Sequence, residues 1–268
     1  MKKLFLILLI LFLQCPVFAQ DIKVSEENGI YHIILSGNKI KKKIEFVQSD
    51  KLITNQNIHK KYNSQLTINT GFFDLKNQQT ISYIINNGEI IADPTKNASL
   101  MNSKELKPYM DKILNRSELR IIKCGRKYKY DIARHQDPIC KGCKLISSAQ
   151  GGPQLLPVKD IYQTLEDEFF LVKKDGKVVR QSASVLFRAS RTVVGIKNNN
   201  LHILIFSNDA RKTIPEVSII CRKLGFEKAM AFDGGSSTSL DYKDIHVIST
   251  QYTGDTGRKL KSFMIINK

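Results

Sequence analysis

Short stretches in which apolar and polar residues alternate make up much of the chain, and most are bounded by Gly, Asn, Pro or Ser. Such a pattern predicts β-strands with one buried face. The predicted strands cover residues 31–35, 39–47, 64–68, 81–85, 89–93, 118–124, 127–133, 144–150, 191–196, 201–207, 228–232 and 261–267. Asn-rich turns at residues 86–88 and 198–200 join two pairs of them into hairpins, because Asn and Gly tolerate a positive φ.

Helical spacing is clearest between Thr213 and Gly225. Thr213 is a suitable cap, Pro215 suits a first turn, apolar residues recur on one face, and Gly225 ends the pattern. Residues 99–118 predict mixed helix interrupted by Pro108, and the polar stretch 158–185 predicts an irregular insertion. Strands outnumber helices, so the expected fold is α+β: a single domain with a mostly antiparallel mixed sheet and a few flanking helices.

The N-terminus has the pattern of a secretory signal. Two lysines precede an apolar stretch, and residues 1–19 contain no acidic residue, so cleavage is expected between Ala19 and Gln20. The apolar stretch is shorter than the roughly 20 residues that span a bilayer, which predicts no transmembrane span. A lipid anchor at Cys15 is disfavoured because Gln14 precedes it. We therefore expect a secreted or periplasmic protein whose mature domain covers residues 20–268.

The formal net charge is +17, and the basic residues are spread along the chain. One interpretation is a solvated lysine surface. The other is attraction to a polyanion, such as nucleic acid, an acidic membrane surface or a phosphate-containing glycan. Because the basic residues form no block, no specific nucleic-acid partner is predicted.

Four cysteines follow the expected cleavage point: Cys124, Cys140, Cys143 and Cys221. An even number in an exported protein favours disulfides, and four cysteines allow three pairings. A redox or zinc role for the C-x-x-C of Cys140 and Cys143 is disfavoured, because no second C-x-x-C is present. Cys221 falls in a helical pattern, which also allows a buried free thiol. The five histidines show no metal-ligand spacing.

Four predicted strands end in small or polar residues, within the segments NTGFFD (69–74), AQGGPQLL (149–156), FRASRTVVG (187–195) and AFDGGSSTSL (231–240). Glycine allows close approach of a ligand, and successive peptide N–H groups bind anions. A carboxylate among such donors suits a developing positive charge or a proton. Taken singly, D-G-G and G-G-P are more often turns than sites, and Arg191 more often pairs with a surface carboxylate. Phe72 and Phe73 are more often core residues than a sugar-stacking platform.

Together with the NNGEI hairpin and in this order, the four segments resemble the phosphodiester glycosidase domain family, the bacterial relatives of the mannose-6-phosphate uncovering enzyme, N-acetylglucosamine-1-phosphodiester alpha-N-acetylglucosaminidase. The resemblance covers roughly residues 62–268. The chain departs from the family pattern at Thr70 and Ser236, where glycine is usual. Both departures bear on the shape of the expected pocket.

The resemblance implies a hydrolase that cleaves the sugar–phosphate bond of a glycosyl-1-phosphodiester, either a small molecule or part of a surface or environmental glycan. Asp233 is expected to be the catalytic carboxylate, Asp74 the second carboxylate and Arg191 the phosphate clamp. The expected substrate-binding residues are Asn69, Gly71, Gly151, Gly152, Thr192, Gly234, Gly235 and Ser236. No cofactor is firmly implied, although a divalent cation at Asp233 and Asp74 is an option.

Other hypotheses remain open beside this one. Asp209 and Glu168 are reserve carboxylates, with structural interpretations as a turn residue and a solvated loop charge. A serine nucleophile is disfavoured because Ser236 lacks the G-x-S-x-G pattern. The alternative function is a non-catalytic binding module for anionic sugars or polyanions.

Overall fold

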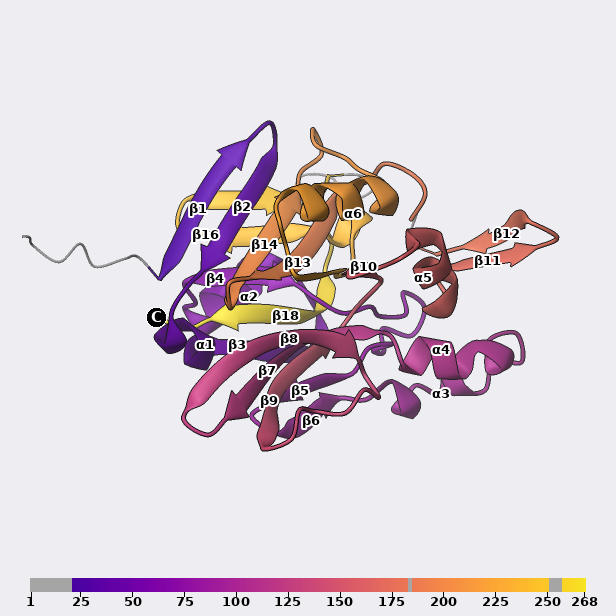
Figure 1. Ribbon diagram of the computed structural model, residues 1–268, viewed down its shortest axis with the longest axis horizontal. Coiled ribbons are helices and arrows are strands. Elements are labelled where there is room, and N and C mark those ends of the chain that lie inside the picture. The colour runs from indigo at the N-terminus through magenta and orange to yellow at the C-terminus, as the bar shows by residue number, and fades with distance from the viewer. Residues whose placement is uncertain (1–20, 183–184, 251–256) are drawn as a thin grey trace, which may run out of the picture.

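Residues 21–182, 185–250 and 257–268 are described by the computed structural model. Three antiparallel sheets form its body (Figure 1). The first has six strands in the order β1 (Ile22–Glu27), β2 (Ile30–Leu35), β14 (Asn200–Phe206), β13 (Arg191–Lys197), β15 (Lys228–Ala231) and β10 (Gln154–Leu156).

The other two large sheets have five strands. One has the order β17 (Ile245–Ile248), β16 (Ser239–Tyr242), β4 (Leu66–Asn69), β18 (Leu260–Ile266) and β3 (Ile44–Ile53). The other has the order β6 (Glu89–Ala92), β5 (Ile84–Asn86), β9 (Cys143–Gln150), β7 (Ser117–Cys124) and β8 (Lys127–Arg134). A separate hairpin, β11 (Leu171–Lys174) and β12 (Lys177–Gln181), projects from the body (Figure 1).

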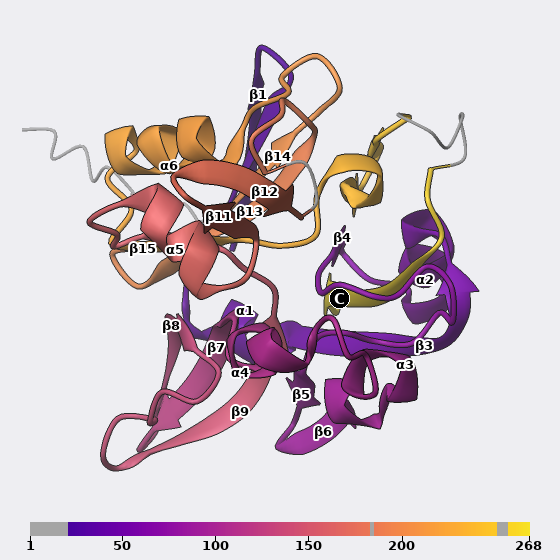
Figure 2. The same ribbon diagram turned by 90° about the vertical axis from the view of Figure 1, so that its right-hand side faces the viewer.

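Short helices flank the sheets (Figure 2). They are α1 (Asn38–Lys43), α2 (Asn55–Tyr62), α3 (Ala98–Met101), α4 (Met110–Leu114), α5 (Ile161–Asp167) and α6 (Ile214–Lys223), with 3₁₀ turns η1 (Pro94–Lys96), η2 (Lys107–Tyr109) and η3 (Gly235–Ser237). No helix in the described ranges is long and apolar enough to cross a membrane. The predicted signal peptide and Cys15 lie outside the described residues.

One hydrophobic core joins the three large sheets. Ile33 of the six-stranded sheet, Ile68 of β4 and Ile121 of β7 belong to the same buried cluster, and all three side chains are almost inaccessible to solvent. A second cluster forms where α6 packs on the other face of the six-stranded sheet. The sheets are thus one packed unit, which confirms the predicted α+β fold.

Local signals placed several elements correctly. Asn87 and Gly88 both have a positive φ in the turn between β5 and β6, as the hairpin prediction requires. Thr213 accepts a hydrogen bond from the N–H of Glu216, whose side chain accepts one from the N–H of Thr213. This capping box fixes the start of α6 at the predicted place.

Residues 39–47 are not one strand, as the alternation predicted. Residues 38–43 form α1, and the strand begins only at Ile44. Ile40 and Ile44 are four residues apart and both buried, a spacing that suits a helical turn as well as alternation. The buried stem of Lys41 carries its ammonium group over the Tyr130 ring, 4.9 Å from the centroid. Such short apolar patterns do not distinguish the two structures.

The predicted irregular insertion at residues 158–185 is also wrong over its described part, since it contains α5, β11 and β12. Asp160 caps α5 by accepting a hydrogen bond from the N–H of Tyr162. Leu165 and Phe170 are buried against the core beside α6. The polar composition of the segment reflects its exposed faces.

The cysteines confirm the prediction of a disulfide. Cys124 and Cys143 face each other across β7 and β9 and are bonded. Cys140 is exposed, with its Sγ 3.9 Å from that of Cys124. The two members of the C-x-x-C therefore do not pair with each other. Cys221 is a buried thiol whose pKa burial raises to about 12.

Candidate active site

The strand ends singled out in the sequence meet around residue 233. The N–H of Asp233 donates to the carbonyl of Thr70 over 2.9 Å. Asn69 donates from Nδ2 to the carbonyl of Asp233 over 2.6 Å. Its Oδ1 accepts from Thr192 Oγ1 over 2.7 Å and from the N–H of Ser239 over 3.1 Å. The side chain of Asn69, itself buried, thus ties β4 to β13 and to the loop before β16.

The other segments close on the same loop through backbone contacts. The N–H of Gly235 donates to the carbonyl of Ser190 over 2.8 Å, and the N–H of Gly152 donates to the carbonyl of Ala231 over 2.9 Å. A side chain at Gly151 would place its Cβ only 2.8 Å from the carbonyl oxygen of Ala231. Glycine is therefore required at position 151 by the close packing of the two segments.

Asp233 is half-buried and lines a cavity of about 250 Å³. Burial raises the pKa of its carboxyl group to about 6, because the charged form loses hydration. The Ser237 hydroxyl, the charge of Arg258, the N–H of Gly234 and the charge of Arg191 oppose that rise. The Ser237 hydroxyl has no partner in normal hydrogen-bond geometry among the described residues, so we regard it as a nearby dipole.

Apolar side chains from three parts of the chain form most of the cavity wall. They are Phe72, Phe73, Leu75 and Ile81 after β4, Leu100, Leu106 and Ile113 around α3 and α4, and Phe169 and Phe170 after α5. Figure 1 shows α3 and α4 lying below α5 and the base of the β11–β12 hairpin. Phe73 belongs to a buried hydrophobic cluster and Phe72 packs against another, as their interpretation as core residues expects. Both line the cavity, and β4 ends at Asn69, so they need not alternate as strand residues do.

Three arginines also line the cavity: Arg116, Arg180 and Arg258. Arg116 is buried, its Nε donates to the carbonyl of Glu168 over 3.0 Å, and its guanidinium lies 4.3 Å from the centroid of the Phe170 ring. Burial lowers the pKa of Arg116 to about 10, and the Glu168 charge counteracts this. Arg180 donates from Nη1 to the carbonyl of Phe169 over 3.2 Å and stacks on the same residue's ring at 3.9 Å.

Arg191 lies next to the Asp233 loop but does not line the cavity, so its role as the phosphate clamp stays a prediction. A Cβ at Gly234 would be 3.5 Å from Arg191 Nη1. The guanidinium is buried, which lowers its pKa to about 10, while the Asp233 charge acts in the opposite direction. Its Nε donates to the carbonyl of Lys212 over 2.9 Å and its Nη2 to that of Phe187 over 2.8 Å. Much of the planar fork is thus engaged by the backbone.

The model of the phosphodiester glycosidase family matches residues 62–266. The chain belongs to this family. The match includes all four strand ends and Asp233, and it confirms the resemblance drawn from them. No curated protein sequence matches the chain significantly.

Solved structures share the fold at low sequence identity. The catalytic domain of zebrafish N-acetylglucosamine-1-phosphodiester alpha-N-acetylglucosaminidase, auto-inhibited by its pro-peptide, superposes with a TM-score of 0.62 at 13% identity, covering 92% of this chain and 82% of that one. A Synechocystis protein described as hypothetical gives 0.55 at 14% identity, with coverages of 91% and 61%. A Burkholderia pseudomallei protein described as exported gives 0.57 at 10% identity, with coverages of 89% and 74%.

The structure does not place Asp74 in the cavity that contains Asp233. Its Oδ1 accepts a hydrogen bond from the N–H of Lys76 over 2.8 Å, and its carbonyl accepts one from the N–H of Gln78. These contacts close a turn after Phe73. The role of Asp74 as a second carboxylate, or as a cation ligand with Asp233, stays a prediction.

The reserve carboxylates have structural roles. Glu168 is wholly buried, so its interpretation as a solvated loop charge is wrong. It accepts hydrogen bonds from the N–H and the hydroxyl of Ser117 and from the N–H of Gln154. Asp209 lies in a turn where its N–H donates to Ser207 Oγ, as its structural interpretation expected.

Several predicted pocket glycines are explained by packing. At Gly71 a Cβ would lie 2.6 Å from the Cβ of Ser82. Gly152 has a φ of +101° and faces the Glu168 carboxylate. Gly71 and Gly152 do not line the cavity, and neither do Gly234, Gly235 and Ser236 of the Asp233 loop itself. Their direct contact with substrate stays a prediction.

Two other features could be taken for sites. A cavity of about 620 Å³ is lined by Lys43, Lys243 and Lys268, but it contains none of the four strand ends. Among the described residues, the group of potential metal ligands that lie close together is Cys124, Cys140 and Cys143, two of which form the disulfide. Neither feature includes Asp233, so the 250 Å³ cavity is the candidate active site.

Proposed function

We propose that the protein is an exported phosphodiester glycosidase that hydrolyses the sugar–phosphate bond of a glycosyl-1-phosphodiester. The observation that supports this most is the position of Asp233. Its half-buried carboxyl group, with a pKa of about 6, lines a cavity together with three arginines, at the tip of a loop within the family match. The carboxylate suits the positive charge that develops on the sugar during cleavage, and the arginines suit the negative charge of the phosphate.

The chemistry makes unequal demands on the protein. Cleavage builds positive charge at the anomeric carbon, which a carboxylate stabilises directly or by activating water. The leaving group is a phosphate monoester, so protonation by an acid is less necessary than in an ordinary glycoside. Cationic contacts to the phosphate matter more. With a pKa of about 6, the Asp233 carboxyl group is largely ionised at neutral pH.

Roles for neighbouring residues follow from their contacts. Arg258 shares the cavity with Asp233 and influences its charge, so we assign it to the phosphate. Arg191 lies beside the loop and adds positive potential, while its Nε and Nη2 each donate to a backbone carbonyl. Asn69 is a positioning residue, because its amide holds the backbone of Asp233 and of Ser239. Asp74 is retained as the proposed second carboxylate.

Hydrolysis can be tested with the purified protein and a methyl diester of α-N-acetylglucosamine 1-phosphate. Release of free sugar that is lost in Asp233→Asn supports the proposal. Because the amide variant keeps the shape of the side chain, its thermal unfolding serves as the control for folding. Turnover that persists in Asp233→Asn would contradict the assignment.

A second candidate is a binding module for anionic sugars or polyanions without turnover. The net charge of +17 and the arginines in the cavity favour it. Binding of the methyl diester without sugar release would support the module. Affinity for any polyanion that weakens steeply with salt and is unchanged in Asp233→Asn would instead indicate general electrostatic binding.

Export is part of the proposal. It rests on the signal-like sequence of residues 1–19, on the Cys124–Cys143 disulfide and on the likeness to a Burkholderia pseudomallei protein described as exported. Mass spectrometry of the protein from the culture medium or periplasm would show a mature chain that begins at Gln20 if cleavage occurs as expected.

A further inference from the structure

The cavity around Asp233 is unusually apolar for a carbohydrate site. Nine of its lining side chains are aliphatic or aromatic, and Ser182 is its one uncharged polar residue among those described. Sugar hydroxyl groups need hydrogen-bond partners when they leave water, and an apolar wall leaves them unpaired. The part of the cavity formed by α3, α4 and the residues after α5 therefore suits something other than a sugar.

The arginines on this wall are held against aromatic rings. Arg116 lies over the Phe170 ring and Arg180 over the Phe169 ring, at 4.3 and 3.9 Å from the centroids. Guanidinium groups in this setting offer positive charge at the edge of an apolar surface. A ligand that joins a phosphate to a hydrocarbon group would satisfy both features.

Exposed apolar side chains also occur at the cavity mouth and on the neighbouring strand β12. Leu75 lines it while 59% exposed. Val178 and Val179 of β12 are 45% and 60% exposed and directly precede Arg180, which lines the cavity. Lys174 and Lys177 flank the tip of the projecting hairpin (Figure 1). A long hydrocarbon chain that leaves the cavity beside Arg180 would run along β12, where these valines are exposed.

We propose that the phosphate of the substrate is esterified on its far side to an apolar alcohol, so that the substrate is lipid-like. This inference rests on the proposed function of the Asp233 site. In the reaction, the oxygen of water bonds to the anomeric carbon and the bond from that carbon to the phosphate oxygen breaks. A water proton passes to Asp233, and the phosphate monoester of the apolar alcohol departs with the bonding electron pair.

The experiment compares two substrates that differ in the alcohol alone, the methyl and n-octyl diesters of α-N-acetylglucosamine 1-phosphate, below the concentration at which the octyl ester forms micelles. We expect kcat/KM to be at least about tenfold higher for the octyl ester, because each additional methylene group that is buried against the apolar wall strengthens binding. Equal or lower kcat/KM for the octyl ester would overturn the inference.

A binding measurement separates this inference from the proposed function. If neither diester is hydrolysed, the proposed function fails, and calorimetry with octyl phosphate and methyl phosphate still decides the question. Octyl phosphate that binds at least about tenfold more tightly supports the apolar pocket. Equal binding of the two phosphates, or no binding of either, overturns it.

Two exposed aliphatic residues provide a matched pair of variants. Leu75→Asn changes the cavity mouth, whereas Ile219→Asn changes the outer face of α6 at a similar exposure of 53%. Leu75→Asn should reduce the preference for the octyl group about threefold or more, whereas Ile219→Asn should leave both this preference and methyl phosphate binding unchanged. A preference that falls equally in Ile219→Asn, or in neither variant, would contradict the assignment.

Discussion

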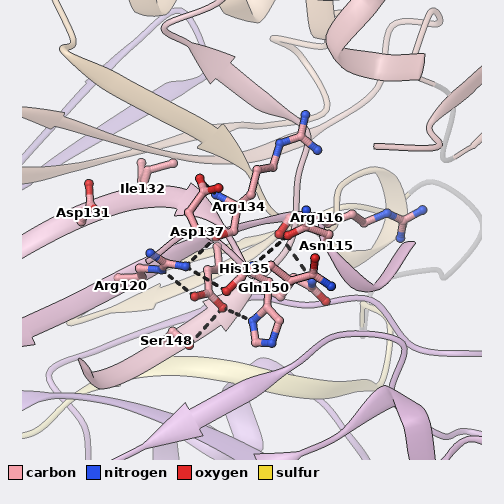
Figure 3. A network of polar contacts seen from close by, with 12 residues as sticks. Asn115, Arg116, Arg120, Asp131, Ile132, Arg134, His135, Asp137, Ser148 and Gln150 are labelled. Atoms are coloured by element: carbon pink, nitrogen blue, oxygen red, sulfur yellow. Dashed lines mark hydrogen bonds and ion pairs between the residues drawn. The ribbon is translucent and has the colours of Figure 1, made fainter. Parts of the chain in front are cut away.

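Glu118 and Asp233 are two carboxylates withdrawn from water in different ways. Glu118, on β7, is buried. Its partners Arg120, His135 and Ser148 lie close together in one polar network (Figure 3). Its Oε1 accepts from Arg120 Nε over 2.6 Å, and its Oε2 lies 2.8 Å from His135 Nδ1 and 3.2 Å from Ser148 Oγ. Asp233 has cationic neighbours too, yet it faces a cavity.

The difference lies in what completes each site. Arg120 also donates to the carbonyls of Arg134 and His135, and the His135 ring stacks on Tyr83, with the centroids 4.0 Å apart. Both oxygens of the Glu118 carboxylate are therefore paired within the protein, as a buried charge requires for stability, while Arg120 Nη1 is buried without a hydrogen-bond partner among the described residues. Around Asp233 the cavity leaves room for a substrate to complete the contacts. A buried carboxylate whose oxygens are both paired within the protein indicates a structural role, and one that lies beside a cavity indicates chemistry.

The largest expected effect is on turnover in Asp233→Asn. Loss of the carboxylate removes the group that meets the developing charge, so we expect kcat to fall by about 10³-fold or more. Thermal unfolding and sugar release measured on the same preparation test this. A variant that unfolds at the wild-type temperature and retains more than a tenth of the activity would contradict the catalytic role of Asp233.

Glu118→Ala should act in the opposite way. It leaves Arg120 buried without its carboxylate, which typically lowers the free energy of unfolding by about 3–5 kcal/mol. Activity per folded molecule should stay near the wild-type value, because Glu118 does not line the Asp233 cavity. Urea unfolding and the rate of sugar release per folded molecule would be measured on the same preparation. A stable but inactive variant would show that the network also serves catalysis.

The disulfide between β7 and β9 is a second structural feature whose contribution to stability can be measured. Cys124→Ser removes the bridge between two cysteines that are 19 residues apart in sequence. Loss of such a bridge should lower the free energy of unfolding by about 3 kcal/mol. Cys143→Ser should cost less, because Cys140 lies 3.9 Å from Cys124 and can replace the lost partner. Chemical denaturation and mass mapping of the bridges test this. Equal losses in the two variants would exclude the replacement pairing.

The sequence predicted the meeting of the strand ends because glycine and polar residues after a buried strand mark positions where backbones approach closely. Asn69, Thr192 and Asp233 could be placed together on that ground. Arg116 and Arg180 could not, since no local motif surrounds them and their position depends on how residues 98–114 and 161–181 pack. The same packing explains Glu168, whose burial is invisible in an acidic, polar stretch.

The last expected effect is a pH dependence that arises from the Asp233 carboxyl group. Because burial raises the pKa of Asp233 to about 6, activity that needs its carboxylate should fall about tenfold per pH unit below that value and level off above it.

The folded chain also binds this proton more tightly than the unfolded chain, whose carboxyl group has a pKa near 3.8. The unfolding free energy should therefore decline as pH rises from about 4 to about 6, and this decline should be absent in Asp233→Asn. Denaturation midpoints across that range for both proteins measure the effect, and parallel curves would show that Asp233 is ionised as easily as an exposed aspartate.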